Sequence, residues 1–186
     1  MLSVETYETA PAPLAEQVRA LEARAWPGAG ADHDPALAPR TVLLVDGTGT
    51  VAASLALLRK EIHLPGRTWQ AAGLSGVVTR PELRGRGIGG RLVAAARAEL
   101  AADPTLDLAL FSCDRPLGPF YEAAGFERLP GTVLVGGTPA DPLATDAPGF
   151  DKTVLAAFLG PDPEPARTAF TGIRVPLYPG PIDRLW

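Results

Sequence analysis

The segment at residues 76–92 constrains the fold more than any other part of the chain. It reads Gly-Val-Val-Thr-Arg-Pro-Glu-Leu-Arg-Gly-Arg-Gly-Ile-Gly-Gly-Arg-Leu. Its apolar start predicts a β-strand that ends at Thr79, and apolar residues that recur every fourth position from Ile88 to Leu100 predict a helix. The glycine-rich loop between them therefore opens directly onto a helix N-terminus.

A loop of this kind is suited to bind an anion. The first amides of a helix have no intrahelical acceptor, and the helix dipole adds positive potential at the same end. Glycines let the backbone approach a phosphate closely, and Arg84 and Arg86 can add charge-assisted hydrogen bonds. We therefore predict that the amides of Arg86 to Gly89 hold a pyrophosphate.

Two other kinds of phosphate-binding loop agree less well with this pattern. A Walker loop is excluded because no Gly-Lys-Ser/Thr follows the glycines. The dinucleotide fingerprint Gly-x-Gly-x-x-Gly does match Gly85, Gly87 and Gly90. That fingerprint normally follows the first strand of a βαβ unit, whereas about 75 residues precede it here, so we disfavour this alternative.

Hydrophobic periodicity predicts a sheet with helices packed on it. Strands are expected at 3–9, 41–45, 51–64, 69–79, 106–112, 132–135, 152–159 and near 169–175, and helices at 14–26, 92–101 and 119–124. The Asp46-Gly47 turn joins two of these strands in a hairpin, and residues 136–149 are expected to form a loop. Strands before and after helices indicate an α/β or α+β protein.

Composition narrows the classes of function. The 186 residues suffice for one domain over 1–186, and the net charge of -4 argues against a nucleic-acid partner. No membrane segment or leader is evident, and the single Cys113 cannot form an intrachain disulfide, so we expect a cytoplasmic protein. Neither His33 nor His63 has ligand spacing with another His or Cys, so no metal site is predicted.

Two ordered motifs in the chain resemble one known family. Arg84-Gly85-Arg86-Gly87-Ile88-Gly89 matches the pattern Arg/Gln-x-x-Gly-x-Gly/Ala, and Phe120-Tyr121-Glu122-Ala123-Ala124-Gly125-Phe126 follows about 30 residues later. From about Thr41 to Leu159 the chain thus resembles the GCN5-related N-acetyltransferases (GNAT). The resemblance implies an α/β (α+β) fold with a mixed, mostly antiparallel central sheet, flanked by helices and splayed between the strands that end at Thr79 and Ser112.

The same resemblance implies acetyl-CoA as co-substrate and assigns residues to it. Strand amides would hold the pantetheine arm and thioester carbonyl, and the loop would hold the pyrophosphate. These cofactor-binding residues are Val77, Val78, Thr79, Arg84, Gly85, Arg86, Gly87, Ile88 and Gly89. The alternative for Val77 and Val78 is that they are simply core residues.

Tyr121 is the candidate catalytic residue. Acyl transfer from a thioester needs a proton for the departing thiolate, which a phenol can donate. From the residues alone, packing beside Phe120 and Phe126 is the favoured role of Tyr121, and the family resemblance reverses this in favour of catalysis. Cys113 is expected to be a small buried residue rather than a nucleophile, because no partner base is evident.

Within the family, the chain most resembles aminoglycoside 2'-N-acetyltransferases, including an ending in an acidic residue plus Trp. This makes Asp183 and Trp186 candidate acceptor contacts, although Trp186 could instead pin the terminus to the core. Where those enzymes place a Glu, this chain has Ser75, a poor base. The candidate replacements are Glu61, Asp114 and Asp151, each of which could instead be a solvated carboxylate.

The expected function is therefore transfer of acetyl from acetyl-CoA to a primary amine of a small, cationic, aminoglycoside-like molecule. Two alternatives stay open: the acceptor is a protein N-terminus or lysine, or the chain is a CoA-binding module that has lost catalysis. The expected partner is a small-molecule amine, with neither nucleic acid nor membrane, and a homodimer is one assembly that the sequence leaves open.

Overall fold

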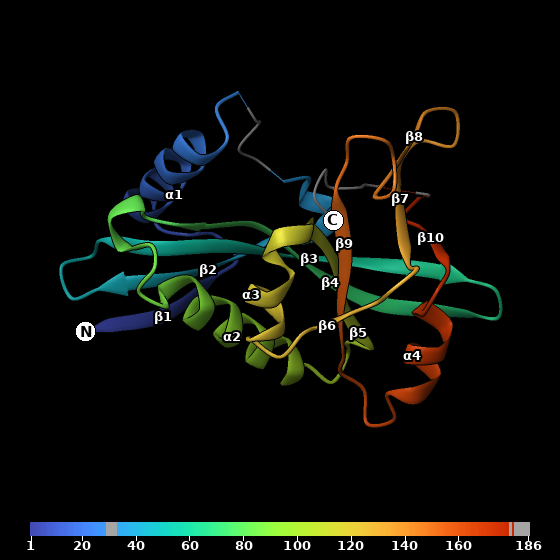
Figure 1. Cartoon of the computed structure of the whole chain (residues 1–186). Coiled ribbons are helices and arrows are strands. Elements are labelled where there is room, and N and C mark those ends of the chain that lie inside the picture. The colour runs from blue at the N-terminus through green and yellow to red at the C-terminus, as the bar shows by residue number, and fades with distance from the viewer. Residues whose placement is uncertain (29–32, 179, 181–186) are drawn as a thin grey trace.

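The computed structural model describes residues 1–28, 33–178 and 180, and its elements follow the chain as shown in Figure 1. Its strands are β1 (Leu2–Tyr7), β2 (Arg40–Asp46), β3 (Val51–Leu64), β4 (Arg67–Thr79), β5 (Leu108–Asp114), β6 (Glu127–Arg128), β7 (Val133–Gly137), β8 (Pro142–Ala144), β9 (Lys152–Phe158) and β10 (Arg174–Pro176). Its α-helices are α1 (Ala12–Ala25), α2 (Ile88–Ala101), α3 (Gly118–Glu122) and α4 (Glu164–Phe170).

Seven strands form the main sheet in the order β1-β2-β3-β4-β5-β9-β6, and β10-β7-β8 form a smaller one. In the main sheet, β4 and β5 run parallel and every other neighbouring pair is antiparallel. The consecutive strands β2, β3 and β4 pair through short turns, as the alternation of apolar runs and turn residues predicts. The predicted mixed, mostly antiparallel sheet is confirmed.

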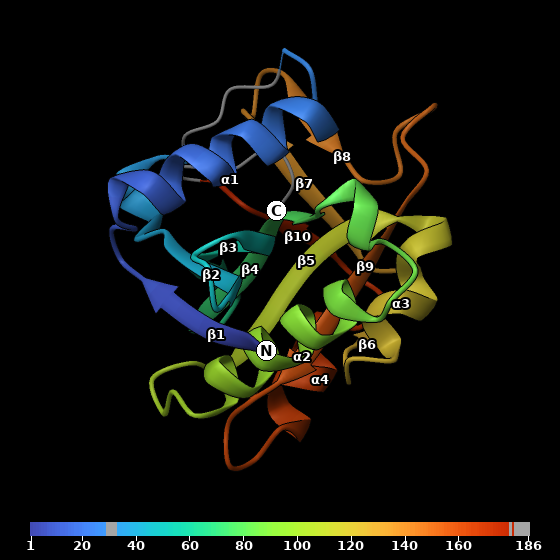
Figure 2. The same ribbon diagram turned by 90° about the vertical axis from the view of Figure 1, so that its left-hand side faces the viewer.

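Helices cover both faces of the main sheet, and Figure 2 shows α1 and α2 on opposite sides of it. Helix α1 buries Leu21 against Leu43, Val45, Val51 and Val78. Helix α2 buries one stripe on the other face: Leu92, Val93, Ala96 and Leu100. Two layers of helix around one sheet bury apolar side chains on both of its faces.

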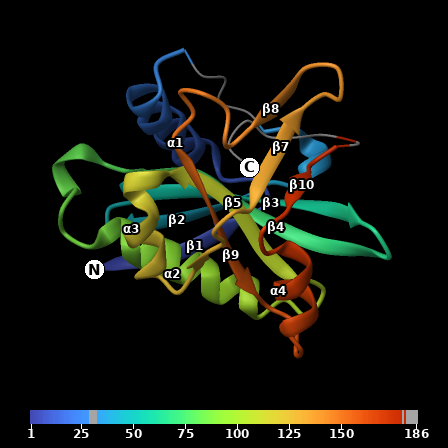
Figure 3. The same cartoon turned by 45° about the vertical axis from the view of Figure 1, so that its right-hand side comes forward.

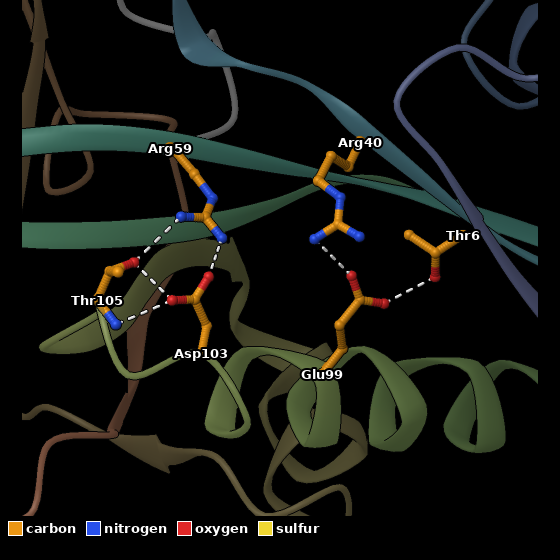
Figure 4. Close-up of polar contacts among 6 residues, drawn as sticks. All are labelled: Thr6, Arg40, Arg59, Glu99, Asp103 and Thr105. Atoms are coloured by element: carbon orange, nitrogen blue, oxygen red, sulfur yellow. Dashed lines mark hydrogen bonds and ion pairs between the residues drawn. The ribbon is translucent and has the colours of Figure 1, made fainter.

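The end of α2 is tied to the sheet by a carboxylate, Glu99 (Figure 4). Glu99 accepts a hydrogen bond from Thr6 Oγ1 on β1 at 2.7 Å and pairs with Arg40 on β2 at 2.9 Å. Because the partners lie on two neighbouring strands, these contacts fix how α2 crosses the sheet.

A second carboxylate, Asp103, lies just after α2 and connects it to one further strand (Figure 4). It pairs with Arg59 on β3 and accepts hydrogen bonds from the hydroxyl and amide of Thr105, at 2.5 and 2.9 Å. The bonds from Thr105 and Arg59 lower the pKa of Asp103 to about 2. The C-terminal end of α2 is therefore anchored at two points, which holds the helix in place beside the glycine loop at its other end.

The smaller sheet and α4 lie beside β9 (Figure 3). The prediction of a strand near 169–175 is wrong over its first part, because Glu164–Phe170 is a helix and only Arg174–Pro176 is a strand. A proline near the helix start and the packing of fully buried Phe170 against Trp69, with ring centroids 5.6 Å apart, favour the helix.

The predicted loop at 136–149 also contains regular structure. Strand β8 pairs with β7 through Val135 and Ala144, so part of the loop is the second arm of a hairpin. The two-residue strand β6 pairs with β9 and was not predicted either. Both strands are too short to show an apolar period, and their pairing partners alone define them.

Candidate functional site

Strands β4 and β5 meet over only two residue pairs and then diverge. Ala71 pairs with Leu108 and Ala72 with Ala109, although β4 continues to Thr79. Among the described residues, the backbone of 77–79 therefore pairs with no strand on the side that faces β5. This opening is the predicted splay of the sheet.

A β-bulge lies in β4 inside the opening. Ser54 of β3 pairs with Val78 and Ala56 pairs with Ser75, so β4 has one residue more than β3 between these pairs. Gly76 lies within the bulge with a φ of +60°, a backbone conformation that glycine adopts more readily than residues with a Cβ. A bulge bends its strand and frees backbone groups from the ladder, so it shapes one wall of the opening.

The glycine loop follows β4 and leaves open space above its backbone. Gly85 and Gly87 both have φ of +74°, and a Cβ added at either one or at Gly90 would meet no atom within 4 Å. The first helical bond in α2 runs from Arg91 N to Gly87 O at 3.0 Å, so the amides of 88–90 have no acceptor within the helix. Free amides under open space fit a pyrophosphate.

The loop is also packed tightly at one point, Gly89. A Cβ at Gly89 would lie 2.9 Å from Thr79 Oγ1 and 3.4 Å from Phe120 Cζ. Arg84 Nε donates to the Thr79 carbonyl at 3.2 Å, so this arginine braces the loop against β4. The exposed Arg86 forms no such bond with any described residue and is suited to contact a phosphate. At Gly89, therefore, the end of β4 and helix α3 both approach the first turn of α2.

Tyr121 lies on α3 with its ring packed in the core, and the residue is 7% exposed. Its ring makes edge contacts with Phe111 and Phe120, at centroid distances of 5.1 and 4.9 Å. Burial, followed by the nearby Cys113 and Asp114, raises the pKa of Tyr121 above its ordinary value. The hydroxyl is therefore protonated at neutral pH, as a proton donor must be, while the ring fills the packing role.

Cys113 is buried near the end of β5, as the sequence predicts. Burial and the neighbouring Asp114 raise the pKa of the thiol to about 11. Its Sγ donates to the Asp114 carbonyl at 3.3 Å. Because the nucleophilic form of cysteine is the thiolate, this residue is unreactive at neutral pH.

Two of the predicted acceptor carboxylates lie together at the ends of β5 and β9. Asp114 pairs with Lys152 Nζ at 2.7 Å, and Asp151 pairs with Arg115 Nε at 2.7 Å. Each carboxylate already has a cation beside it, which reduces the attraction of either one for a cationic substrate.

The structure separates the other predicted acceptor residues. Glu61 accepts a hydrogen bond from Gln70 Nε2 at 2.9 Å, at the end of the β3–β4 hairpin that lies away from the bulge. Ser75 is 3% exposed and lies next to the bulge. Asp183 and Trp186 lie outside the described residues.

Within the described ranges 1–28, 33–178 and 180, no group of three His, Cys, Asp or Glu side chains is arranged to hold a metal ion, and the absence of a metal stays a prediction. No helix in those ranges is both long and apolar enough to cross a bilayer.

Glu22 of α1 approaches the bulge of β4 and is not among the site residues predicted from the sequence. A Cβ added at Gly76 would lie 3.1 Å from Glu22 Oε1. A lone glycine inside an apolar strand pattern is a usable signal for the bulge itself. No spacing in the sequence relates residue 22 to residue 76, so this contact emerges only from the packing of α1 on the sheet.

The open sheet, the bulged strand and the glycine loop on a helix N-terminus define an acyltransferase. The chain belongs to the GNAT acetyltransferase family, since the family model described as acetyltransferase (GNAT) domain matches residues 12–129, more than half of the chain. No curated protein sequence gives a significant match.

Solved structures share the fold at low sequence identity. The GNAT family N-acetyltransferase YhbS from Escherichia coli, in complex with CoA, has a TM-score of 0.61 at 18% identity, covering 95% of this chain and 89% of that one. Escherichia coli ElaA has a TM-score of 0.59 at 14% identity, covering 84% and 99%. The ribosomal-protein-S18-alanine N-acetyltransferase from Escherichia coli has a TM-score of 0.55 at 14% identity, covering 87% and 96%.

Proposed function

We propose that the protein transfers an acetyl group from acetyl-CoA to a primary amine of a small, cationic molecule. The observation that carries this proposal is the divergence of β4 and β5 directly beside a glycine loop with open space over free amides. A thioester and an amine can meet in such an opening, because the edge of β4 at 77–79 pairs with no other strand within the part of the chain that the structure describes.

The residues suited to hold acetyl-CoA follow one another along the chain, from the end of β4 to the start of α2. The amides of Arg86 to Gly89 and the Arg86 side chain would bind the pyrophosphate, since they combine a helix N-terminus with a guanidinium. The backbone of Val77, Val78 and Thr79 would bind the pantetheine arm and the thioester carbonyl. The CoA complex of YhbS, which shares this fold, supports CoA as the group that binds here.

When bound, acetyl-CoA supplies a thioester whose carbonyl carbon accepts the amine: a C–N bond forms, the C–S bond breaks, the amine loses one proton and the sulfur gains one. Tyr121 holds a proton near the end of β5, and its raised pKa keeps that proton in place at neutral pH. A protonated phenol lowers the energy of negative charge on a departing sulfur by hydrogen bonding to it and can then supply the proton.

The proposal of a small cationic acceptor rests on the resemblance of the sequence to aminoglycoside 2'-N-acetyltransferases. Asp183 and Trp186 are part of that proposal. Ser75 supports the competing view of a CoA-binding module without turnover, because a serine cannot replace the base that those enzymes place there.

Thiol release from acetyl-CoA tests the proposal. The purified chain is given acetyl-CoA with kanamycin, spermidine, phenethylamine or a short peptide with a free N-terminus, and free thiol is followed over time. We expect release that depends on kanamycin or spermidine. Release with the peptide alone would indicate a protein acceptor, and binding of acetyl-CoA without amine-dependent release would indicate the inactive module.

A further inference from the structure

Helix α1 directs a carboxylate at the bulge of β4. An added Cβ at Gly76 would lie 3.1 Å from Glu22 Oε1 but 4.0 Å from its Cδ, so the charged end of the side chain is the part that approaches the strand. Any side chain at residue 76 would occupy this space. The glycine thus permits the positive φ of the bulge and also leaves space for the carboxylate to approach the strand.

The position of Glu22 is fixed by its neighbour in the helix. Leu21 is 4% exposed and packs in one cluster with Val78, which follows the bulge on β4. The backbone of α1 is therefore held over this part of the strand, and the half-buried Glu22 lies at the edge of the same contact. A side chain on a packed helix is positioned more firmly than one on a loop.

Resting on the function proposed above, we propose that Glu22 binds the amine of the cationic acceptor beside the Gly76–Val77 bulge. The acceptor must approach the backbone of 77–79, where the thioester would lie, and Glu22 approaches Gly76, the residue that directly precedes this backbone. A carboxylate and an ammonium form a charge-assisted hydrogen bond, roughly twice as strong as a neutral one.

The other candidate carboxylates are less suited to this role. The contacts that the structure describes for Asp114 and Asp151 are with Lys152 and Arg115 rather than with the bulge, and Glu61 lies toward the far end of the hairpin. Ser75 lies beside the bulge but carries no charge. Glu22 already makes polar contacts of its own, and the acceptor ammonium adds to them or replaces them.

Two variants and one matched control test this role. Glu22→Gln removes the charge and keeps the shape, and Gly76→Ala introduces a methyl group that displaces the carboxylate. Glu16→Gln removes an exposed carboxylate from the same helix and changes the net charge equally. For each chain, calorimetry measures binding of kanamycin with CoA present and binding of acetyl-CoA alone, and thiol release gives KM for kanamycin and kcat.

We expect Glu22→Gln to weaken kanamycin binding and raise its KM by about 10- to 100-fold, as for loss of a hydrogen bond to a charged group. Gly76→Ala should also weaken kanamycin binding and raise its KM. The control Glu16→Gln should behave as the wild type. The affinity for acetyl-CoA should be the same in the wild type, Glu22→Gln and Glu16→Gln. Equal kanamycin affinity in the wild type and Glu22→Gln, or no kanamycin binding by the wild type, would overturn the inference. If the wild type binds kanamycin through Glu22 but releases no thiol, the inference holds and the proposed catalysis fails.

Discussion

Thr79 Oγ1 lies 2.9 Å from the point that a Cβ on Gly89 would occupy. The last residue of β4 and the first turn of α2 therefore touch through a residue without a side chain. The distance between the strand, which is suited to hold a thioester, and the helix N-terminus, which is suited to hold a pyrophosphate, depends on this contact.

Gly89→Ala should push β4 and α2 apart. The added methyl group meets Thr79 and Phe120, and overpacking of this kind costs about 1–3 kcal/mol of unfolding free energy. We also expect acetyl-CoA affinity to fall about tenfold or more, measured by calorimetry. Gly90→Ala is the control, because a Cβ there meets nothing within 4 Å. Alanine in a helix should stabilise that variant by up to about 1 kcal/mol, so equal melting temperatures for the two variants would contradict the role of this contact.

Gly87→Glu should abolish acetyl-CoA binding. The change places a negative charge at the helix N-terminus and imposes a side chain where φ is +74°. Gly49→Glu is matched to it, since Gly49 lies in the β2–β3 turn with φ of +79° and open space around it. Calorimetry should show wild-type affinity for acetyl-CoA in Gly49→Glu. Unchanged affinity in Gly87→Glu would contradict the binding of the pyrophosphate at this loop.

Tyr121→Phe should lower kcat by roughly 10²-fold with little change in acetyl-CoA affinity, because only the proton donor is removed and the buried ring remains. The pKa of Tyr121 is raised above 10, so the active protonated form persists to higher pH than a free phenol would. The rate profile of the wild type should thus show no loss from Tyr121 between pH 8 and 10. Wild-type turnover in Tyr121→Phe would leave this residue with packing alone.

Asp103→Asn should destabilise the protein at neutral pH and matter less in acid. The pKa of Asp103 is lowered from 3.8 to about 2, so its contribution is complete above pH 4 and is lost as pH falls toward 2. The partly exposed pair with Arg59 limits the effect to about 1 kcal/mol. Urea unfolding at pH 7, 4 and 2.5 measures the difference between the two chains, and a difference that grows in acid would refute the assignment.

Cys113 should make stability fall at alkaline pH. In the folded protein its pKa is raised from 9.0 to about 11. The unfolded chain therefore loses the thiol proton at a lower pH than the folded protein does, and the free energy of unfolding falls as pH rises from 9 to 11. The contribution is roughly 2 kcal/mol. Cys113→Ala removes it, so the stability of this variant relative to the wild type should improve between pH 8 and 11. A constant difference across that range would show that the thiol titrates normally.

Strong local patterns in the sequence predicted most of the sheet. The apolar runs that became β2, β3 and β4 flank turn residues, and the loop from Arg84 to Gly89 lies between a strand and a helix as expected. These features depend on residues close together in the chain, where backbone preferences and side-chain period act directly. The glycine loop could be found for the same reason.

Elements with weak local preference were decided by their partners. The segment at 164–170 folds as a helix because Ala166 and Phe170, four residues apart, are both buried in one cluster, and β6 and β8 exist only because β9 and β7 pair with them. Short segments cannot outweigh tertiary packing, so their pattern alone is ambiguous between strand, helix and loop.

The sequence alone determined the family, the mixed sheet and the place of the glycine loop, because each is written in a short, contiguous pattern. Only the tertiary structure decided that Asp114 and Asp151 face cations, that Glu61 lies away from the bulge and that Glu22 lies against Gly76. Those relationships join residues 36 to 54 positions apart or depend on strand register. The packing of α1 on one face of the sheet and the divergence of β4 from β5 set them, and no local spacing encodes either.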